Sequence, residues 1–320
     1  MRILLTGSNG FIGSRIAADA QARGWRVVGL GRSAASATPV TEYVSHDLSR
    51  PLPPDLVAGT VDAVVHCAAL ASPWAPPRAM VAANVLGTRN VVDWASRTGR
   101  PHLVYVSSSS VLYREADQFD LDEASPVPPD DEQINVYSRT KRIGERAVER
   151  YPGSWAVLRP RAVFGPGDTV LLPRILRAAR RGVLPVFEPK AGPPVRCDVT
   201  YVDTAAHYCV EAVARGATGT YQVTNADPVD LYPFLLGILD RLGVRPRAVR
   251  VPVAVAAAVA GAAEQVSALL LGYREPPLTR YGVSVLARSK TFDVSHCLRD
   301  LGAPPVDLDE AVDRLVRAHG

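Results

Sequence analysis

Short apolar runs alternate with longer segments of helical periodicity through the first half of the chain. Helical periodicity spans residues 11–24 and roughly 78–98, and it resumes near residue 136. The acidic, proline-containing stretch 115–132 predicts a loop. The alternation is typical of βαβ units and a parallel sheet. Six apolar runs predict its strands, at residues 2–7, 26–32, 43–48, 61–69, 102–110 and 155–160.

Beyond about residue 165 the alternation breaks down and Pro and Gly become frequent. Residues 168–182 predict a long helix, and 198–225 indicate a return to the sheet. We therefore expect an α/β fold, a doubly wound parallel sheet of the Rossmann type, with a smaller C-terminal region. The predicted dinucleotide-binding domain is 1–165 with the return segment at about 198–225. The predicted substrate-binding region is 166–197 with 226–320.

Composition indicates an ordinary soluble protein. Of 320 residues 47% are apolar and 21% charged, and a net charge of +4 without a basic block argues against nucleic acid as a partner. The four cysteines lack CxxC spacing, so we expect free thiols and no metal site. The N-terminal apolar run is too short for a signal peptide, which favours the cytoplasm.

One segment, 251–272, is nearly long and apolar enough to span a membrane. Glu264 and Gln265 interrupt it, and its many alanines contribute little to insertion. We expect a buried or substrate-covering helix without stable membrane insertion. Contact with a membrane surface is the alternative.

A glycine-rich turn follows the first strand and opens the first helix. The sequence TGSNGFIG, residues 6–13, has TGxxGxxG spacing. Such a turn lets the backbone approach a pyrophosphate and aims a helix N-terminus at its charge. The predicted cofactor contacts in this turn are Gly7, Asn9, Gly10, Phe11, Ile12 and Gly13.

The end of the second strand predicts which dinucleotide binds. A carboxylate there would repel a 2′-phosphate, but the chain offers Arg32 and Ser33, which suit phosphate. We expect NADP(H) to be preferred, with NAD(H) as the alternative. Asp47 and Leu48 are expected at the adenine. Ala68 and Ala69 would let the cofactor lie close to the backbone.

Tyr137 and Lys141 stand four residues apart at the start of a predicted helix. Only three lysines and 11 tyrosines exist, so chance would give about 0.1 such pairs. An ammonium beside a phenol lowers the phenol's pKa toward the range useful for acid–base catalysis. The side chain of Lys141 can also bond the nicotinamide ribose.

A third polar group is expected where the fifth strand ends, in the run from Ser107 to Ser110. Open α/β sheets present ligand-facing residues at the carboxyl ends of their strands. Ser108 is the predicted substrate-binding hydroxyl, and Ser109 is the alternative.

Together, TGxxGxxG, the serine run and Tyr137-x3-Lys141 resemble an extended short-chain dehydrogenase/reductase over essentially the whole chain. The segments 158–176, 198–208 and 275–293 resemble the bacterial branch near 3β-hydroxysteroid dehydrogenases and 2-alkyl-3-oxoalkanoate reductases. The resemblance implies a catalytic set of Ser108, Tyr137 and Lys141. It also implies that Pro160 and Val163 pass the nicotinamide, and that homodimers form through the Tyr–Lys helix.

The function that follows is an NADP(H)-dependent ketoreductase or alcohol dehydrogenase acting on a hydrophobic small molecule, such as a β-keto acid, a steroid or a polyketide-like ketone. Nucleotide-sugar enzymes are the main alternative. Those usually carry Asn after the sixth strand, where this chain has Arg161 and Ala162. A nucleotide-sensing regulator is a further alternative, although such relatives have lost the Tyr or the Lys. No catalytic role is assigned to EPPLTRYGV, residues 275–283.

Overall fold

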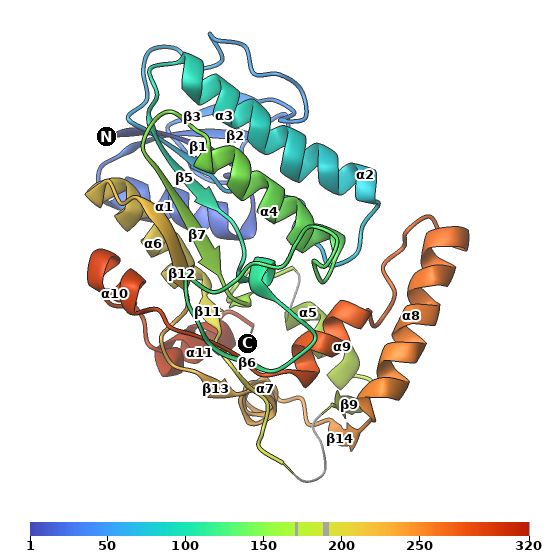
Figure 1. The fold of residues 1–320 in the computed structure, drawn as a ribbon. Helices are drawn as coiled ribbons and strands as arrows, with labels where there is room; N and C mark the ends of the chain where they lie inside the picture. The colour runs from blue at the N-terminus through green and yellow to red at the C-terminus, as the bar shows by residue number, and fades with distance from the viewer. Residues whose placement is uncertain (170–171, 188–191, 320) are drawn as a thin grey trace.

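The computed structural model describes residues 1–169, 172–187 and 192–319. Within them, a parallel sheet of seven strands forms the centre of the N-terminal half (Figure 1). Its order is β12-β7-β5-β4-β1-β2-β3, so the chain changes direction across the sheet between β1 and β4. Ligands bind at such a switch point in open α/β sheets. The strands are β1 Arg2–Thr6, β2 Arg26–Gly31, β3 Glu42–Ser45, β4 Ala63–His66, β5 His102–Val106, β7 Trp155–Pro160 and β12 Gly219–Val223.

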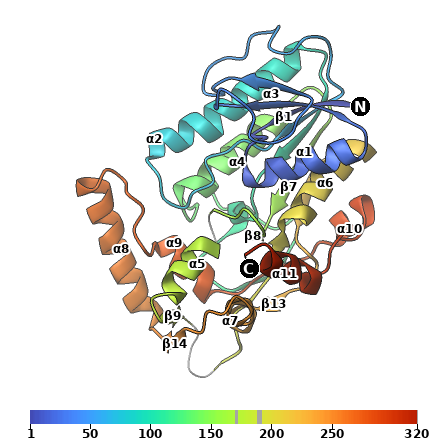
Figure 2. The ribbon, with the colours of Figure 1, turned by 180° about the vertical axis from the view of Figure 1, so that it is seen from behind.

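Helices cover both faces of this sheet, which confirms the doubly wound fold. On the face toward the viewer in Figure 1 lie α3 (Gly87–Arg97) and α4 (Val136–Glu149). Figure 2 shows the opposite face, where α1 (Phe11–Ala22) packs beside α6 (Val202–Arg215). Each pair buries apolar side chains against the strands and forms its own core.

The C-terminal half consists of small sheets and helices around another apolar core. A four-stranded sheet has the order β13-β10-β15-β6, and β11-β8 and β14-β9 form two-stranded sheets. The strands are β6 Gln118–Leu121, β8 Val163–Phe164, β9 Val183–Val186, β10 Arg196–Cys197, β11 Thr200–Tyr201, β13 Val229–Asp230, β14 Arg247–Arg250 and β15 Lys290–Phe292. The helices are α5 Leu172–Ala179, α7 Leu231–Arg241, α8 Val253–Leu270, α9 Arg280–Ala287, α10 Ser295–Leu301 and α11 Leu308–Arg317.

Two local expectations were wrong in detail. The stretch 115–132, expected to be a loop, contains strand β6, because β15 pairs with it from about 170 residues later in the chain. The helix expected over 78–98 is three consecutive segments, α2 (Pro77–Met80), a π-helical turn (Val81–Leu86) and α3. The wider π-helical turn carries Asn84, whose side chain reaches Leu70 and Thr140.

Helix α8 is buried along one stripe only, which consists of Ala256, Ala260, Glu264 and Ser267. Both ribbon views place it at the outer edge of the C-terminal half. It packs against α9, and the carboxylate of Glu264 accepts hydrogen bonds from the backbone and the guanidinium of Arg280. By length and composition α8 is the one described helix that could cross a membrane. Its other apolar side chains, such as Val259 and Leu269, are exposed.

Candidate active site

The glycine-rich turn has the close backbone packing that a dinucleotide site needs. Gly7 has a φ of +72°, and a Cβ on it would lie 2.8 Å from the backbone of Ala68. A Cβ on Gly13 would lie 2.1 Å from the carbonyl oxygen of Gly7. No side chain caps the start of α1 at Gly10, so its first N–H groups are available to an anion. These residues fit a pyrophosphate.

A cleft of about 870 Å³ opens beside this turn. Gly10 and the exposed face of α1 line it, and its sides are closed by Ala37, Thr38, Pro39, Pro166, Gly167 and Thr169. The side chain of Asn9, which is predicted to contact the cofactor and lines this cleft, also holds the loop after β2. Its Oδ1 accepts hydrogen bonds from the Ala37 amide at 2.9 Å and the Ser36 hydroxyl at 3.1 Å. Asn9 therefore shapes the wall of the cleft.

At the end of β2 both predicted phosphate ligands are accessible. Arg32 and Ser33 are exposed, and the Ser33 carbonyl accepts a hydrogen bond from the Tyr43 hydroxyl. Asp47 is also exposed, and its carboxylate accepts a hydrogen bond from the Ser49 amide. That bond holds its pKa below the ordinary value, with Arg32 adding an attractive charge. Arg32 thus lies near the predicted adenine position with its guanidinium open to solvent.

The other residues predicted to contact the adenosine differ in how accessible they are. The side chain of Leu48 is 8% exposed and belongs to the core under α3, so little of it can pack on a ring. The Ala68 amide donates to the hydroxyl of Thr6, which holds the end of β4 against the glycine-rich turn. Ala69 is exposed next to it.

Helix α4 presents Tyr137 and Lys141 from its first two turns. The side chain of Asn135 caps the helix by accepting a hydrogen bond from the Ser138 amide at 2.7 Å. Lys141 is 1% exposed, and its Nζ donates to the Val106 carbonyl at 2.6 Å, at the end of β5. The same ammonium lies 4.1 Å from the centre of the Tyr105 ring. Lys141 is thereby fixed between the helix and the sheet.

The pKa shift of Tyr137 is opposite to the one expected from the sequence. Burial raises the pKa of Tyr137, and Lys141 is not among the charges that act on it. Burial also lowers the pKa of Lys141 to about 7, against the attraction of Cys67 and Glu145. Desolvation is the largest cause of the raised pKa of Tyr137, and it outweighs the hydrogen bond with Ser108, which acts in the opposite direction.

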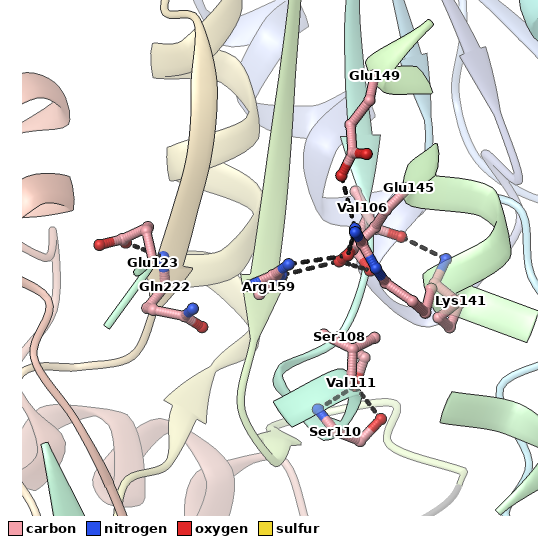
Figure 3. A network of polar contacts seen from close by, with 12 residues as sticks. Val106, Ser108, Ser110, Val111, Glu123, Lys141, Glu145, Glu149, Arg159 and Gln222 are labelled. Atoms are coloured by element: carbon pink, nitrogen blue, oxygen red, sulfur yellow. Dashed lines mark hydrogen bonds and ion pairs between the residues drawn. The ribbon is translucent and has the colours of Figure 1, made fainter. Parts of the chain in front are cut away.

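Hydrogen bonds distinguish the four serines of the run, and Figure 3 shows Ser108 beside Ser110. Ser107 is buried and donates to Glu145 at 2.6 Å, and Ser109 is buried beside the Tyr113 hydroxyl at 3.1 Å. Ser108 is only half-buried, and its hydroxyl lies 3.0 Å from that of Ser110. A hydrogen bond from Ser108 also favours the phenolate of Tyr137. Among the candidates, Ser108 is therefore the hydroxyl that faces the tyrosine.

A buried ion pair supports the site from behind. Arg159 on β7 donates two hydrogen bonds to Glu145 on α4, at 2.8 and 2.9 Å, and both side chains are at most 4% exposed (Figure 3). The attraction of Arg159 keeps the pKa of Glu145 below its ordinary value although burial opposes this. Together with the bond from Ser107, the pair joins α4, β5 and β7 directly beneath the catalytic candidates.

Three further residues at the site were not predicted. Asn84 comes from the π-helical turn and donates to Thr140 on α4, and such turns are frequent at functional sites. Tyr281 on α9 lies within electrostatic reach of Tyr137 and hydrogen-bonds Ser110. Arg161 lies between β7 and β8 and is 4% exposed. The sequence carried a signal only for Arg161, as a departure from the asparagine expected in that region.

Pro160 and Val163, expected along the nicotinamide, end β7 and begin β8. Pro160 is buried, whereas Val163 is half-buried and pairs with Thr200 of β11. The backbone between them therefore passes the carboxyl end of the sheet, on the side where Ser108 lies.

Known proteins resemble this chain in sequence and in fold. The chain is 31% identical over 327 residues to the 2-alkyl-3-oxoalkanoate reductase of Stenotrophomonas maltophilia, with 98% of each chain covered. It is 31% identical to a 3β-hydroxysteroid-dehydrogenase/decarboxylase of Arabidopsis thaliana, over 86% of this chain and 66% of the relative. The crystal structure of Thermus thermophilus UDP-glucose 4-epimerase with NAD superposes with a TM-score of 0.75 at 23% identity, covering 100% and 98%.

The family assignment rests on the larger part of the chain. Residues 3–226, from the first strand to the end of the return segment, match a single family description. That range contains the glycine-rich turn, Ser108, Tyr137 and Lys141. The chain belongs to the NAD dependent epimerase/dehydratase family, and thus to the extended short-chain dehydrogenases/reductases.

Proposed function

We propose that the protein is an NADP(H)-dependent ketoreductase that reduces the carbonyl group of a hydrophobic small molecule. The observation that carries the proposal is the arrangement at the end of β5, where the phenol of Tyr137 meets the half-buried hydroxyl of Ser108 beside a buried lysine. An acid poised to give up its proton suits reduction, because the alkoxide formed from a ketone is a far stronger base than a phenolate.

Each residue has a chemical task in this scheme. Ser108 donates a hydrogen bond to the substrate oxygen, and Tyr137 protonates that oxygen as negative charge develops on it. Lys141 lies one helical turn below and can stabilise the resulting phenolate, since its pKa near 7 lets it take up a proton. A dinucleotide, when bound, supplies the hydride. The N-terminus of α1, Arg32 and Lys141 are the groups that would hold it.

The substrate side of the site supports a hydrophobic ligand. A small apolar cavity of about 60 Å³ has Phe164 of β8, Arg161 and Ala162 in its wall. Residue 162, near which nucleotide-sugar enzymes carry an asparagine, is an alanine in this cavity wall. The side chains that line it are Arg161, Ala162, Phe164, Leu172, Ile175, Cys197, Val199, Leu231, Phe234, Leu235, Ile238, Val285, Leu286 and Leu315.

The test is NADPH consumption with a panel of apolar ketones, in the wild type and in Tyr137→Phe. Loss of the proton donor should lower kcat by about 100- to 10,000-fold while the Kd for NADPH stays unchanged. An active phenylalanine variant would refute the role of Tyr137. If no ketone is reduced but a UDP- or dTDP-sugar raises the melting temperature, the nucleotide-sugar alternative is correct.

The cofactor preference has its own test in Arg32→Ala. The exposed guanidinium should recognise the 2′-phosphate. In the variant the KM for NADPH should therefore rise about tenfold or more, and the KM for NADH should change little. An unchanged KM for NADPH would remove Arg32 from the phosphate site.

A further inference from the structure

Helix α8 has the reverse of the usual arrangement of polar and apolar side chains. A surface helix normally turns its polar residues to water and its apolar residues to the core. In α8, Glu264 and Ser267 are buried, and Gln265 is the one polar residue that is exposed among Val253–Leu270, all of which the structure describes. A broad apolar face that is open to solvent marks an interaction surface. The larger exposed side chains of the helix are Val255, Val259, Val266, Leu269 and Leu270.

The buried stripe holds α8 against the body of the protein. The carboxylate of Glu264 accepts hydrogen bonds from the backbone and the guanidinium of Arg280, at 2.8 and 2.9 Å. The hydroxyl of Ser267 accepts a hydrogen bond from the Trp74 indole at 3.0 Å. A helix that crossed a bilayer would give up these bonds and place Glu264 in hydrocarbon, which is costly. Although α8 is long enough to cross a membrane, its contacts therefore favour a position along a surface.

The C-terminal end of α8 is the most exposed part of its apolar face. Leu269 and Leu270 are 80% and 77% exposed, and Leu271, directly after the helix, is 54% exposed. Close to these leucines, the rings of Trp74 and Tyr273 lie with their centroids 5.7 Å apart. Both aromatic residues are half-buried. Leucines flanked by Trp and Tyr suit the boundary between hydrocarbon and water, because each of these rings joins an apolar body to a polar group.

Positive charge gathers around the other end of the helix. Strand β14 leads directly into α8, β9 pairs with β14, and α5 packs on β9 (Figures 1 and 2). Residues 174–187 and 245–280 contain nine of the 36 basic residues of the chain and only two of its 32 acidic residues. Those two glutamates are already paired, Glu264 with Arg280 and Glu275 with Arg174. The other seven arginines are exposed, and we call them the arginine cluster: Arg177, Arg180, Arg181, Arg245, Arg247, Arg250 and Arg274.

The arginine cluster is largely free to bind an external anion. Arg245 pairs with Asp240 at 2.5 Å. In the part of the chain that the structure describes, no carboxylate lies within ion-pair distance of the other six arginines. Excess positive charge beside an exposed apolar helix attracts a surface that is both negatively charged and apolar underneath.

We propose that α8 and the arginine cluster bind the surface of a bilayer that contains anionic phospholipids. The valines and leucines of the exposed face enter the boundary between headgroups and acyl chains, while the arginines contact lipid phosphates. A second copy of this chain would offer no matching negative charge, since the same face is positive in both copies. The proposal goes beyond the ketoreductase function and does not depend on it.

The experiment measures sedimentation of the full chain with sucrose-loaded vesicles. One set is phosphatidylcholine alone, and the other contains about 30% phosphatidylglycerol, each at about 0.1 and about 0.5 M NaCl. The variants are Leu270→Asp, which changes the apolar face, and Arg247→Glu, which changes the arginine cluster. Phe119→Asp is the matched control for the first, because Phe119 is 57% exposed on β6. Arg150→Glu is the control for the second, because Arg150 is exposed and follows the last residue of α4.

The wild type should bind the vesicles that contain phosphatidylglycerol, and high salt should weaken this binding about tenfold or more. Leu270→Asp should lower the partition coefficient about tenfold or more, because a charge replaces a buried leucine at the bilayer. Arg247→Glu should lower it about tenfold on the anionic vesicles. Both control variants should bind as the wild type does. Melting temperatures without vesicles should stay close to that of the wild type for all four variants, because each changes an exposed side chain.

Failure of the wild type to bind anionic vesicles would overturn the proposal. Equal losses in Leu270→Asp and Phe119→Asp would also do so, because binding would not then depend on α8. Binding that ignores both phosphatidylglycerol and salt would remove the arginine cluster from the site and contradict the proposal as stated. Light scattering supplies the remaining outcome. A wild-type dimer that Leu270→Asp converts to a monomer, without vesicle binding, would make the apolar face an interface between two copies of this chain.

Discussion

Replacing Lys141 by methionine should make the protein more stable at pH 7 while abolishing its activity. The lysine is fully buried, and desolvation lowers its pKa from 10.5 to about 7. Between these values the unfolded chain binds a proton that the folded chain does not. Stability of the wild type therefore rises as pH increases from 7 toward 10.5 and is lowest, on this account, near pH 7.

The magnitude follows from the shift. A change from 10.5 to about 7 corresponds to about 5 kcal/mol of unfavourable free energy at pH 7. Methionine removes that cost but leaves the Val106 carbonyl without its donor, which costs about 1–3 kcal/mol. It also loses the contact with the Tyr105 ring, worth about 1 kcal/mol. The expected net gain for Lys141→Met is about 1–3 kcal/mol.

Urea unfolding at several pH values between 7 and 9.5 measures the difference in stability between the wild type and Lys141→Met. The free energy of unfolding of the wild type should rise by about 1.4 kcal/mol per pH unit relative to Lys141→Met. Tyr137→Phe is the matched control. Burial holds its phenol protonated throughout this range, so its pH profile should run parallel to that of the wild type.

Parallel profiles for the wild type and Lys141→Met would refute the reasoning, because they would show that Lys141 carries its charge in the folded protein at every pH tested. A large loss of stability in Lys141→Met at pH 7 would do the same. It would mean that the bond to Val106 and the Tyr105 contact outweigh desolvation.

Two further predictions concern the hydrogen bonds around this lysine. Ser108→Ala should reduce kcat about 10- to 100-fold. Ser109→Ala should keep near-normal turnover, because the Ser109 hydroxyl meets only Tyr113. Equal effects of the two substitutions in a steady-state assay would count against Ser108. Glu145→Gln should cost about 3–5 kcal/mol in urea unfolding at pH 7, because it leaves Arg159 buried and unpaired. The pKa of Glu145 lies below 4.5, so its contribution should be present above that pH and lost as pH falls further. A wild type and a glutamine variant of equal stability at pH 7 would contradict this.

Local sequence patterns predicted the parts of the site that are built locally. The glycine-rich turn, the helix that follows it and the Tyr137–Lys141 spacing each depend on residues within one element, so their periodicity and residue types identified them. The serine run narrowed to one residue only in the structure, because the partners of Ser107 and Ser109 lie on other elements.

Features that depend on distant partners escaped prediction. Strand β6 exists because β15 pairs with it, and no local pattern shows that. Tyr281 reaches the site from α9, about 140 residues after Tyr137 in the sequence. The raised pKa of the phenol likewise depends on how deeply several elements bury it. The spacing of Tyr137 and Lys141 in the sequence indicates that a charge is near the phenol. It does not show how far the phenol is removed from water.

The site is assembled from two halves of the chain, and this division has a consequence for protein engineering. The groups assigned to proton transfer come from the end of β5 and from α4, in the half that contains the parallel sheet, whereas Tyr281 and most of the apolar cavity come from the C-terminal side. A mutant library confined to the cavity wall, for example at Phe234 and Leu286, would leave the acid–base machinery and the cofactor turn intact. Every member could then be screened with one NADPH assay, so that new substrates are sought without rebuilding the chemistry.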